Sequence, residues 1–139
     1  MRKQLHNALL ETMGIHSKQA RQDFMKIDLS AGQPKVLTYL LEHEGCQQSE
    51  LAINCSVEPA TMTVLLRNMS KSGLIQKKAK HVSCGKRAYS IYFTDLGREK
   101  ANKAQEFIND LEEKSYKGFT EEEKDTLILL LQRIVDNLS

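Results

Sequence analysis

The segment that decides the fold is residues 47–75, which read QQSELAINCSVEPATMTVLLRNMSKSGLI. Its first part, residues 47–53, has the spacing of a short helix with one apolar face. After a turn, Pro59 suits the first position of a second helix, where a missing N–H costs little. Gly73 then suits the residue that ends this helix. The spacing therefore predicts two helices joined by a sharp turn.

The second helix of this pair has two chemically different sides. Apolar residues recur at helical spacing on one side, whereas the other side is small or hydrogen-bonding. The residues of the polar side are Ala60, Thr61, Thr63, Val64, Arg67, Asn68 and Lys71. Small residues let a helix end approach base edges, and hydroxyl and helix N–H groups bind phosphate oxygens. We expect this side to contact duplex DNA, with Val64 suited to a thymine methyl group and Arg67 to guanine or phosphate.

Extended periodicity replaces helical periodicity after this helix. Residues 74–78 and 89–93 are predicted to pair as a hairpin, with a basic tip between them. The cations of the hairpin are Lys77, Lys78, Lys80, Lys86 and Arg87. Lys86 or Arg87 would lie over a minor groove, whose narrow width concentrates negative potential. Two short helices followed by such a ribbon predict a winged helix-turn-helix in residues 34–93.

Charge is distributed unevenly along the chain, although the formal net charge is only +2. Residues 59–94 contain no Asp or Glu, and their cations are Arg67, Lys71, Lys77, Lys78, Lys80, Lys86 and Arg87. A solvated face that merely keeps the protein in solution is the alternative, but such faces usually intersperse both signs. A long carboxylate-free segment instead favours a polyanionic partner.

Long amphipathic helices are predicted on both sides of this segment. Residues 2–26 carry an apolar stripe, and the last helix is rich in leucine. Together they offer more apolar surface than one small core covers, which predicts a homodimer. The predicted fold is mainly α with a small β-hairpin. Residues 1–33 would form the N-terminal dimerisation helix and the start of the next helix, 34–93 the DNA-binding lobe, and 94–139 the C-terminal dimerisation helices, all within one intertwined domain.

Hydroxyl residues mark three predicted helix starts. In a capping box the hydroxyl accepts the N–H three residues on, and the longer side chain found there reaches back. Ser30 with Gln33 and Thr120 with Glu123 have this spacing. Thr94 is the expected cap of the long helix that follows the hairpin.

These motifs, in this order and spacing, resemble the MarR family of transcription regulators. The resemblance rests on LSAGQ at 29–33, QSELA at 48–52, VEPATMT at 57–63, KSGLI at 71–75 and FTDLGR at 93–98. It implies an obligate dimer, more often a repressor, that binds a pseudo-palindromic operator. Two positions depart from the family pattern. Gly85 stands where the wing usually has aspartate, which leaves Arg87 without its orienting carboxylate, and Val64 stands where arginine is common.

The resemblance also implies a regulatory site for a small aromatic or phenolic effector. In the family such molecules lodge between the dimer helices and the DNA-binding lobe, and their binding changes the spacing of the two recognition helices. The residues expected to line this site are Met13, His16, Thr38 and Tyr39. For His16, a hydrogen-bonded interior position is the alternative.

The cysteines suggest a second means of regulation. Cys46, Cys55 and Cys84 form an odd set without a CxxC motif, so a disulfide framework is not expected. Lysines near Cys84 would lower the pKa of its thiol, which makes a redox sensor an alternative regulatory function. His43 and Cys46 offer two zinc ligands, but a site needs three or four. We therefore expect neither a metal nor another cofactor.

Other classes of protein are disfavoured by what the sequence lacks. It has no Gly-rich phosphate loop, HExxH or GxSxG motif, so an enzyme is not expected. It has neither an apolar run long enough to cross a bilayer nor the apolar core of a signal peptide, so the cytoplasm is the expected location. A winged helix used as a protein-interaction module is the remaining alternative. It would need an exposed apolar surface on residues 60–71, where only Val64 supplies one.

Overall fold

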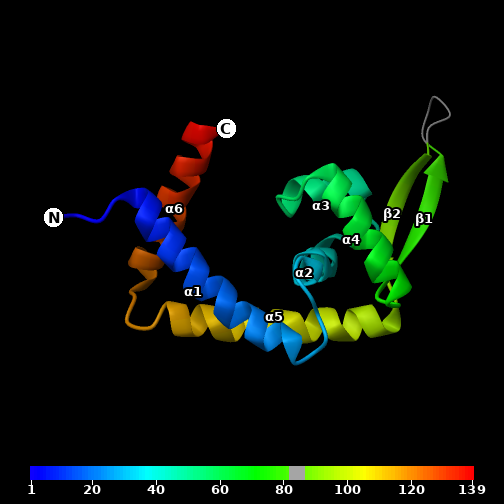
Figure 1. The fold of residues 1–139 in the computed structure, drawn as a ribbon, viewed down its shortest axis with the longest axis horizontal. Helices are drawn as coiled ribbons and strands as arrows, with labels where there is room; N and C mark the ends of the chain where they lie inside the picture. Colours follow the sequence, from blue (N-terminus) through cyan, green and yellow to red (C-terminus); the bar gives the residue numbers. More distant parts are fainter. Residues whose placement is uncertain (82–86) are drawn as a thin grey trace. The chain divides into compact units, whose positions relative to one another are not determined.

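The computed structural model describes residues 1–81 and 87–139, and only the backbone of residues 80, 81 and 87. The helices in these ranges are α1 (Leu5–Met25), α2 (Gln33–His43), α3 (Gln48–Asn54), α4 (Pro59–Lys71), α5 (Asp95–Ser115) and α6 (Glu121–Leu138). The strands β1 (Ile75–His81) and β2 (Arg87–Phe93) pair as an antiparallel hairpin (Figure 1). The predicted fold class, mainly α with a small hairpin, is confirmed. The chain forms two compact units, residues 1–108 and 109–139.

The core lies in the part that we call the winged lobe, residues 29–104. Its members come from α2, α3, α4, the hairpin and the first half of α5. The large side chains that are fully buried are Leu37, Leu40, Leu51, Met62, Leu66, Met69, Ile91 and Val36. Burial of each contributes about 1.5 to 3 kcal/mol relative to an exposed position. The lobe therefore has a complete core within a single chain.

Helices α3 and α4 form the predicted helix-turn-helix. Pro59 is the first residue of α4, and Gly73, at φ 75°, follows its C-terminus. This φ lies in the left-handed region that glycine adopts without steric cost, so the chain can leave the helix there. Because the apolar side of α4 is held in the core, its polar side faces outward.

The hairpin is longer than the sequence indicates. Ile75 pairs with Phe93 at its base, and the pairing continues outward to residues 81 and 87. Ile91 and Phe93 are buried and lie on the same face as Tyr89, as their alternation predicts. Beyond Lys78 the β1 sequence has no large apolar residue, so the alternation that marks a strand is lost there even though backbone pairing persists.

A short extended segment joins the helix-turn-helix to the free edge of β2. The Ile91 N–H donates to the Cys46 carbonyl at 2.9 Å, and the Gly45 N–H donates to the Ile91 carbonyl at 2.8 Å. Gln47 forms an isolated antiparallel bridge with Ser90. Because α3 begins at the next residue, this pairing places the start of α3 beside the hairpin.

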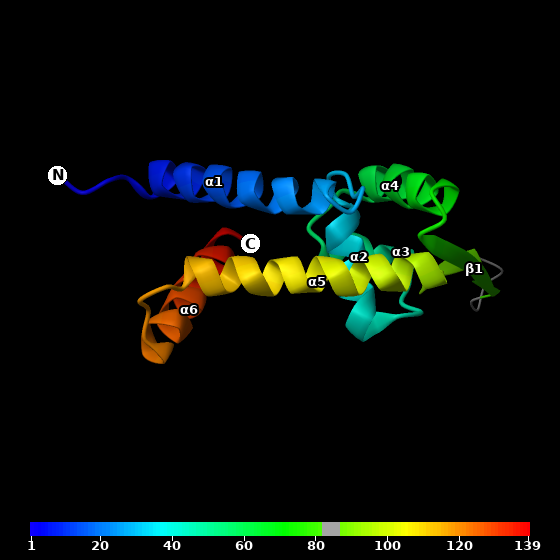
Figure 2. The same cartoon turned by 90° about the horizontal axis from the view of Figure 1, so that it is seen from below.

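Helix α5 starts from a tight joint at the base of the hairpin, as Figures 1 and 2 show. Thr94 caps it as predicted, since its Oγ1 accepts the Gly97 N–H at 2.9 Å. The same hydroxyl donates to the Gly73 carbonyl at 2.5 Å, and the Thr94 N–H donates to the Leu74 carbonyl at 3.1 Å. A Cβ on Gly97 would lie 1.8 Å from the Leu74 carbonyl oxygen. Only glycine fits this contact.

A carboxylate beside this joint connects three elements. Glu44, just after α2, accepts the backbone N–H of Phe93 at 2.9 Å and Nη2 of Arg98 at 2.6 Å. The Arg98 guanidinium also lies 4.9 Å from the centre of the Phe93 ring. The hydrogen bond from the Phe93 N–H is the largest cause that holds the pKa of Glu44 below its usual value; burial opposes it, and Arg98 adds to the lowering.

Only one of the two predicted capping boxes forms. At α6, the Thr120 hydroxyl accepts the Glu123 N–H at 3.1 Å, and the Glu123 carboxylate accepts the Thr120 N–H at 2.9 Å. At α2, Gln33 does reach back to the Ser30 N–H at 3.0 Å, but no side chain caps the helix. The N-cap is Gly32, at φ 85°, so α2 begins two residues later than the Ser30 signal indicates.

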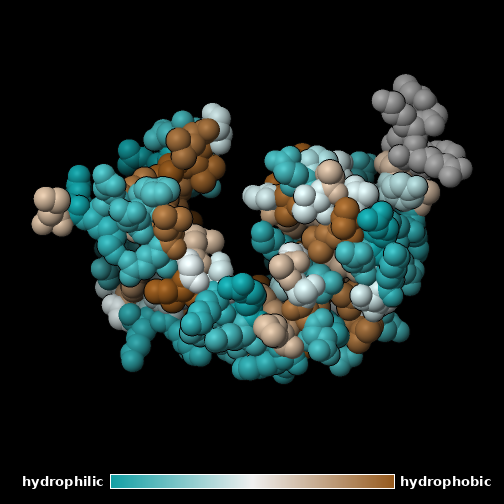
Figure 3. Space-filling model, viewed as in Figure 1, coloured by the Kyte–Doolittle hydropathy of each residue, from teal (hydrophilic) through white to brown (hydrophobic). Residues whose placement is uncertain are grey.

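Helices α1 and α6 bury no residue in the single chain. Both carry large apolar side chains that are exposed, and Figure 3 shows brown residues gathered along α6. The exposed apolar residues of α6 are Leu127, Ile128, Leu129, Leu130, Leu131, Val135 and Leu138. Those of α1 are Leu5, Leu9, Leu10, Met13, Ile15 and Met25. The division of the chain into dimerisation helices and a DNA-binding lobe remains a prediction.

Candidate nucleic-acid interface

The polar side of α4 is exposed along the whole helix. Its residues are Ala60, Thr61, Thr63, Val64, Arg67, Asn68 and Lys71, and each is exposed. No carboxylate interrupts them, because the nearest acidic residue in the sequence is Glu58, just before the helix. Val64 is the only large apolar residue among them, with 45% of its surface exposed. The proposed recognition residues therefore share one accessible surface.

The first turn of α4 has no side-chain cap. Glu58 occupies the N-cap position, but its side chain makes no hydrogen bond to the first turn. The first N–H groups of a helix have no partner within the helix, and the macrodipole adds partial positive charge there. The first turn of α4 can thus donate hydrogen bonds to a phosphate oxygen without losing a cap.

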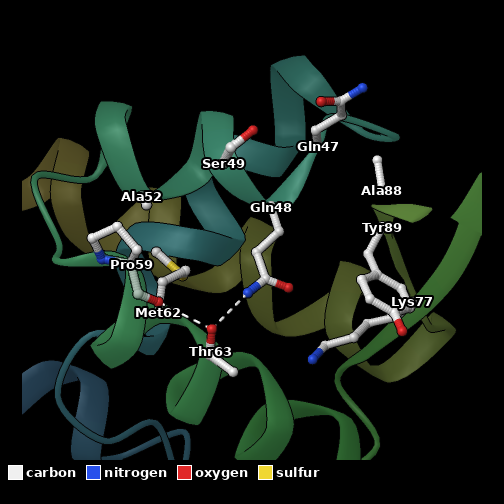
Figure 4. A pocket seen from close by; sticks show the side chains of 10 residues that line it. All are labelled: Gln47, Gln48, Ser49, Ala52, Pro59, Met62, Thr63, Lys77, Ala88 and Tyr89. Carbon is white, nitrogen blue, oxygen red and sulfur yellow. Dashed lines mark hydrogen bonds between the residues drawn. The ribbon is translucent and has the colours of Figure 1, made fainter. Parts of the chain in front are cut away.

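A cleft of about 690 Å³ lies between α3, the N-terminal half of α4 and the hairpin (Figure 4). The residues that line it are Gln47, Gln48, Ser49, Ala52, Pro59, Met62, Thr63, Lys77, Ala88 and Tyr89. In this view the side chains of Gln48 and Thr63 point toward each other across the cleft. Gln48 Nε2 donates to the Thr63 hydroxyl at 2.9 Å, and that hydroxyl donates to the Pro59 carbonyl at 3.0 Å. Gln48 is not among the residues predicted from the sequence.

The two successive lysines of β1 lie on opposite faces of the hairpin. Lys77 lines the cleft, with Nζ 6.0 Å from the centre of the Tyr89 ring. Lys78 lies on the other face, with Nζ 4.6 Å from the centre of the Tyr92 ring. It also contributes to the lowered pKa of Glu44. Although both lysines were predicted as wing contacts, only Lys77 lines the same cleft as Thr63.

Three other cations were predicted in the wing: Lys80, Lys86 and Arg87. Lys86 falls outside the described residues, and for Lys80 and Arg87 only the backbone strand is described. Their predicted contacts therefore remain predictions. Cys84, the candidate redox residue, also falls outside the described residues.

The residues predicted to line an effector site do not all come together within the chain. Thr38 and Tyr39 line a groove of about 520 Å³, together with Lys35, Leu41, Glu42, Asn54, Cys55, Ser56 and Gln105. Met13 and His16 are not part of its lining and are exposed on α1. The Tyr39 hydroxyl donates to the Glu50 carboxylate at 2.7 Å, and this bond, with desolvation, raises the pKa of Tyr39 to about 12. The Tyr39 ring stacks on His43 at 4.2 Å.

The two described cysteines are poor candidates for oxidant sensing. Burial raises the pKa of the Cys46 thiol to about 11 and also raises that of Cys55. The thiolate is the reactive form, so these raised pKa values disfavour oxidation of either thiol at neutral pH. Among residues 1–81 and 87–139, no three His, Cys, Asp or Glu side chains gather in a way that would hold a metal ion.

The helices in the described part of the chain are too short or too polar to span a membrane. This finding agrees with the polar surface of the long α5, whose buried residues are Gly97, Ala101 and Ala104.

Comparisons with known proteins agree with this architecture. The sequence model of the MarR family matches residues 29–83. The HTH-type transcriptional repressor IacR of Pseudomonas putida is 26% identical over 130 residues, which cover 94% of this chain and 77% of that protein.

Two solved structures with bound DNA share the fold. The S. aureus MepR–DNA complex has a TM-score of 0.87 at 18% identity and covers 99% of this chain and 100% of the other. A MarR-family regulator from Listeria monocytogenes complexed with 26mer DNA has a TM-score of 0.83 at 23% identity, covering 99% and 90%. With the helix-turn-helix and hairpin described above, these matches show that residues 29–83 are similar to the MarR family and that the chain shares the fold of winged helix-turn-helix regulators.

Proposed function

We propose that this chain is a sequence-specific DNA-binding regulator that acts as a homodimeric repressor. The observation that carries the proposal is the outward side of α4, which is exposed, free of carboxylates and small at its N-terminal end. Such a surface fits the major groove, which is wide enough to admit one helix. The relatives with bound DNA and the repressor name of IacR support the same function.

The proposed homodimer rests on the exposed apolar faces of α1 and α6. Leu129 of α6 is 62% exposed and Ile15 of α1 is 60% exposed, and both lie among other exposed apolar residues. Monomeric proteins rarely leave such contiguous surfaces open to water, whereas a second copy would cover them. A two-fold dimer presents two α4 helices about 34 Å apart, so its operator would be pseudo-palindromic.

An aromatic or phenolic effector is the proposed regulator of this repressor. The groove beside Thr38 and Tyr39 lies within the range of about 300 to 1,000 Å³ that is typical of small-molecule sites. The Tyr39 ring, which stacks on His43, provides an aromatic surface in the groove, and Lys35 provides a positive charge. In a dimer, Met13 and His16 of α1 would complete the lining.

The test of DNA binding is selection from a randomised duplex pool, followed by fluorescence anisotropy on the enriched site. Affinity should fall at least about a hundredfold between about 50 and 200 mM salt, because released counterions drive phosphate binding. Binding without a salt dependence would contradict the proposed surface.

Two pairs of variants sharpen this test. Arg67→Ala should weaken binding and alter base preference, whereas Arg21→Ala on α1 should not. Lys77→Gln should weaken binding more than Lys78→Gln, because only Lys77 lies on the cleft beside α4. Adding hydroxybenzoate should release the DNA from the wild type, and Tyr39→Ala should reduce that release.

A further inference from the structure

The hydrogen bonds of the Thr63 hydroxyl restrict what it can offer to DNA. A hydroxyl has one proton to donate and two lone pairs that accept. The proton goes to the Pro59 carbonyl, one turn back along α4, and one lone pair accepts from Gln48 Nε2. One lone pair is left. In this arrangement the exposed Thr63 side chain can accept a hydrogen bond from a base but cannot donate one.

Gln48 holds this arrangement from a different helix. It is the first residue of α3, and its half-buried side chain crosses the cleft to α4 (Figure 4). The pairing of the preceding segment with β2 fixes where α3 begins, and therefore where the Gln48 amide lies. The neighbouring Gln47 also lines the cleft, but its side chain is exposed and does not cap α3.

We propose that Gln48 is a positioning residue that determines base preference through Thr63. By donating to the Thr63 oxygen, the amide fixes the hydroxyl in a rotamer in which only a lone pair faces the groove. The donors that bases present in the major groove are the amino groups of adenine N6 and cytosine N4. The pair therefore favours a base with an amino group under Thr63, and disfavours the acceptors guanine O6 and thymine O4.

The amide is needed because the Pro59 bond alone does not fix the hydroxyl. Threonine in a helix has two accessible rotamers, and the bond to the carbonyl four residues back stabilises only one of them. Without Gln48, the hydroxyl is free to turn its proton toward the groove, where it would donate to N7, O6, O4 or a phosphate. Loss of Gln48 should therefore weaken discrimination more than it weakens affinity.

This inference rests on the proposed DNA-binding function, and one experiment separates the two. Randomised duplexes are selected with the wild-type chain, Gln48→Ala, Thr63→Val and the double variant. Gln76→Ala is the matched control, because Gln76 is an exposed glutamine of β1 that does not line the cleft. Thr63→Val identifies the base position that the hydroxyl contacts, because the enrichment of bases should change at that position. Thr63→Ser keeps the hydroxyl and should retain the preference, but only while Gln48 is present.

We expect the wild type to enrich adenine or cytosine at one position in each half-site. Gln48→Ala should lower this discrimination about fivefold, within the range that single base pairs contribute. The double variant should lose no more than either single variant, because both remove the same interaction. Gln76→Ala should keep the wild-type preference.

Several results would overturn the proposal. The proposal would be wrong if Gln48→Ala left the base preference unchanged, or if the losses in the double variant were additive. It would also be wrong if the two glutamine variants had equal effects, or if Gln48→Ala lowered affinity equally on all sequences. If alanine at position 48 lowers the melting temperature, Gln48→Met keeps the side-chain length without the amide and gives the same test. Failure of the wild type to enrich any sequence would instead contradict the proposed function.

Discussion

The winged lobe and the two end helices differ in where their apolar side chains lie. In the lobe, residues such as Leu37, Leu51 and Met62 are fully buried within one chain. In α1 and α6, apolar residues just as large are exposed, and neither helix buries a residue. The lobe has a complete core within one chain and can hold α4 in place without help. The end helices leave their apolar side chains exposed, and a second copy of the chain would bury them.

The largest effect is expected from Gly97→Ala, which tests how rigid the lobe is. The added methyl group would lie 1.8 Å from the Leu74 carbonyl oxygen, and backbone cannot yield as a flexible side chain can. The free energy of unfolding should fall by about 3 kcal/mol or more, measured by urea denaturation.

Gly14→Ala is the counterpart in α1. Nothing lies within 4 Å of the position of its Cβ, so the helix should gain about 0.5 to 1 kcal/mol. A loss of stability in this variant would show that another helix packs closely at Gly14. If Gly97→Ala and Gly14→Ala changed the free energy of unfolding equally, the winged lobe and α1 would not differ in packing as described.

The next largest effect is expected from Leu131→Asp in α6. An unpaired charge in the proposed dimer interface should raise the dimer dissociation constant about a hundredfold. The lobe, whose core does not include this residue, should stay folded. Sedimentation velocity measures the first quantity and thermal unfolding the second. Asn137→Asp adds the same charge at an exposed polar position of α6 and should leave the dimer intact. A monomer–dimer equilibrium that Leu131→Asp does not alter would argue against an interface on α6.

A smaller effect is expected from Thr120→Ala. This substitution removes the hydroxyl that accepts the Glu123 N–H at the start of α6, which should cost about 1 kcal/mol. Because α6 buries nothing in the single chain, local capping matters more here than in a helix held by a core. Amide hydrogen exchange in residues 121–124 should accelerate. Thr126→Ala, farther along the same helix, should not change it, and matching rates in both variants would rule out a role for the cap.

The smallest effect is expected from Glu44→Gln and depends on pH. Hydrogen bonds from Phe93 and Arg98 lower the pKa of Glu44 in the folded chain below its usual value of 4.5. A carboxylate with a lowered pKa contributes stability above its unfolded value, and this contribution is lost as the pH falls through the folded value. Wild-type stability should therefore decline below about pH 4.5 more steeply than that of Glu44→Gln. Unfolding by urea at pH 7 and pH 3.5 tests this, with Glu42→Gln as the exposed control. Parallel curves for all three proteins would refute the assignment.

Features set by neighbouring residues could be predicted from the sequence. Pro59, Gly73 and Thr120 mark helix ends through local backbone chemistry, and the polar side of α4 follows from helical spacing alone. The Ser30 signal was wrong about where α2 begins because Gly32 adopts a left-handed conformation and takes the N-cap position. Local backbone chemistry allowed either Ser30 or Gly32 to be the N-cap of α2. In the structure Gly32 is the N-cap, and it lies against Leu65.

Contacts between distant residues could not be predicted in this way. Gln48 and Thr63 are fifteen positions apart, and Glu44 meets Phe93 across forty-nine. No spacing rule links such pairs, because their approach depends on how α2, α3 and the hairpin pack. That Lys77 and Lys78 lie on opposite faces could have been predicted from the sequence, because successive side chains of a strand lie on opposite faces.

The pairing of residues 45–47 with β2 has a consequence for how the protein behaves in solution. It covers one edge of the hairpin and leaves β1, within the described residues, as the strand with an open edge. An open edge is a template on which strands of other molecules add, and lysines are a common protection against this. We therefore expect Lys77 and Lys78 to help to keep the protein from aggregating, in addition to what they contribute to binding DNA. Neutralising both at once should promote assembly through β1, and the resulting loss of active protein would look like lost affinity for DNA.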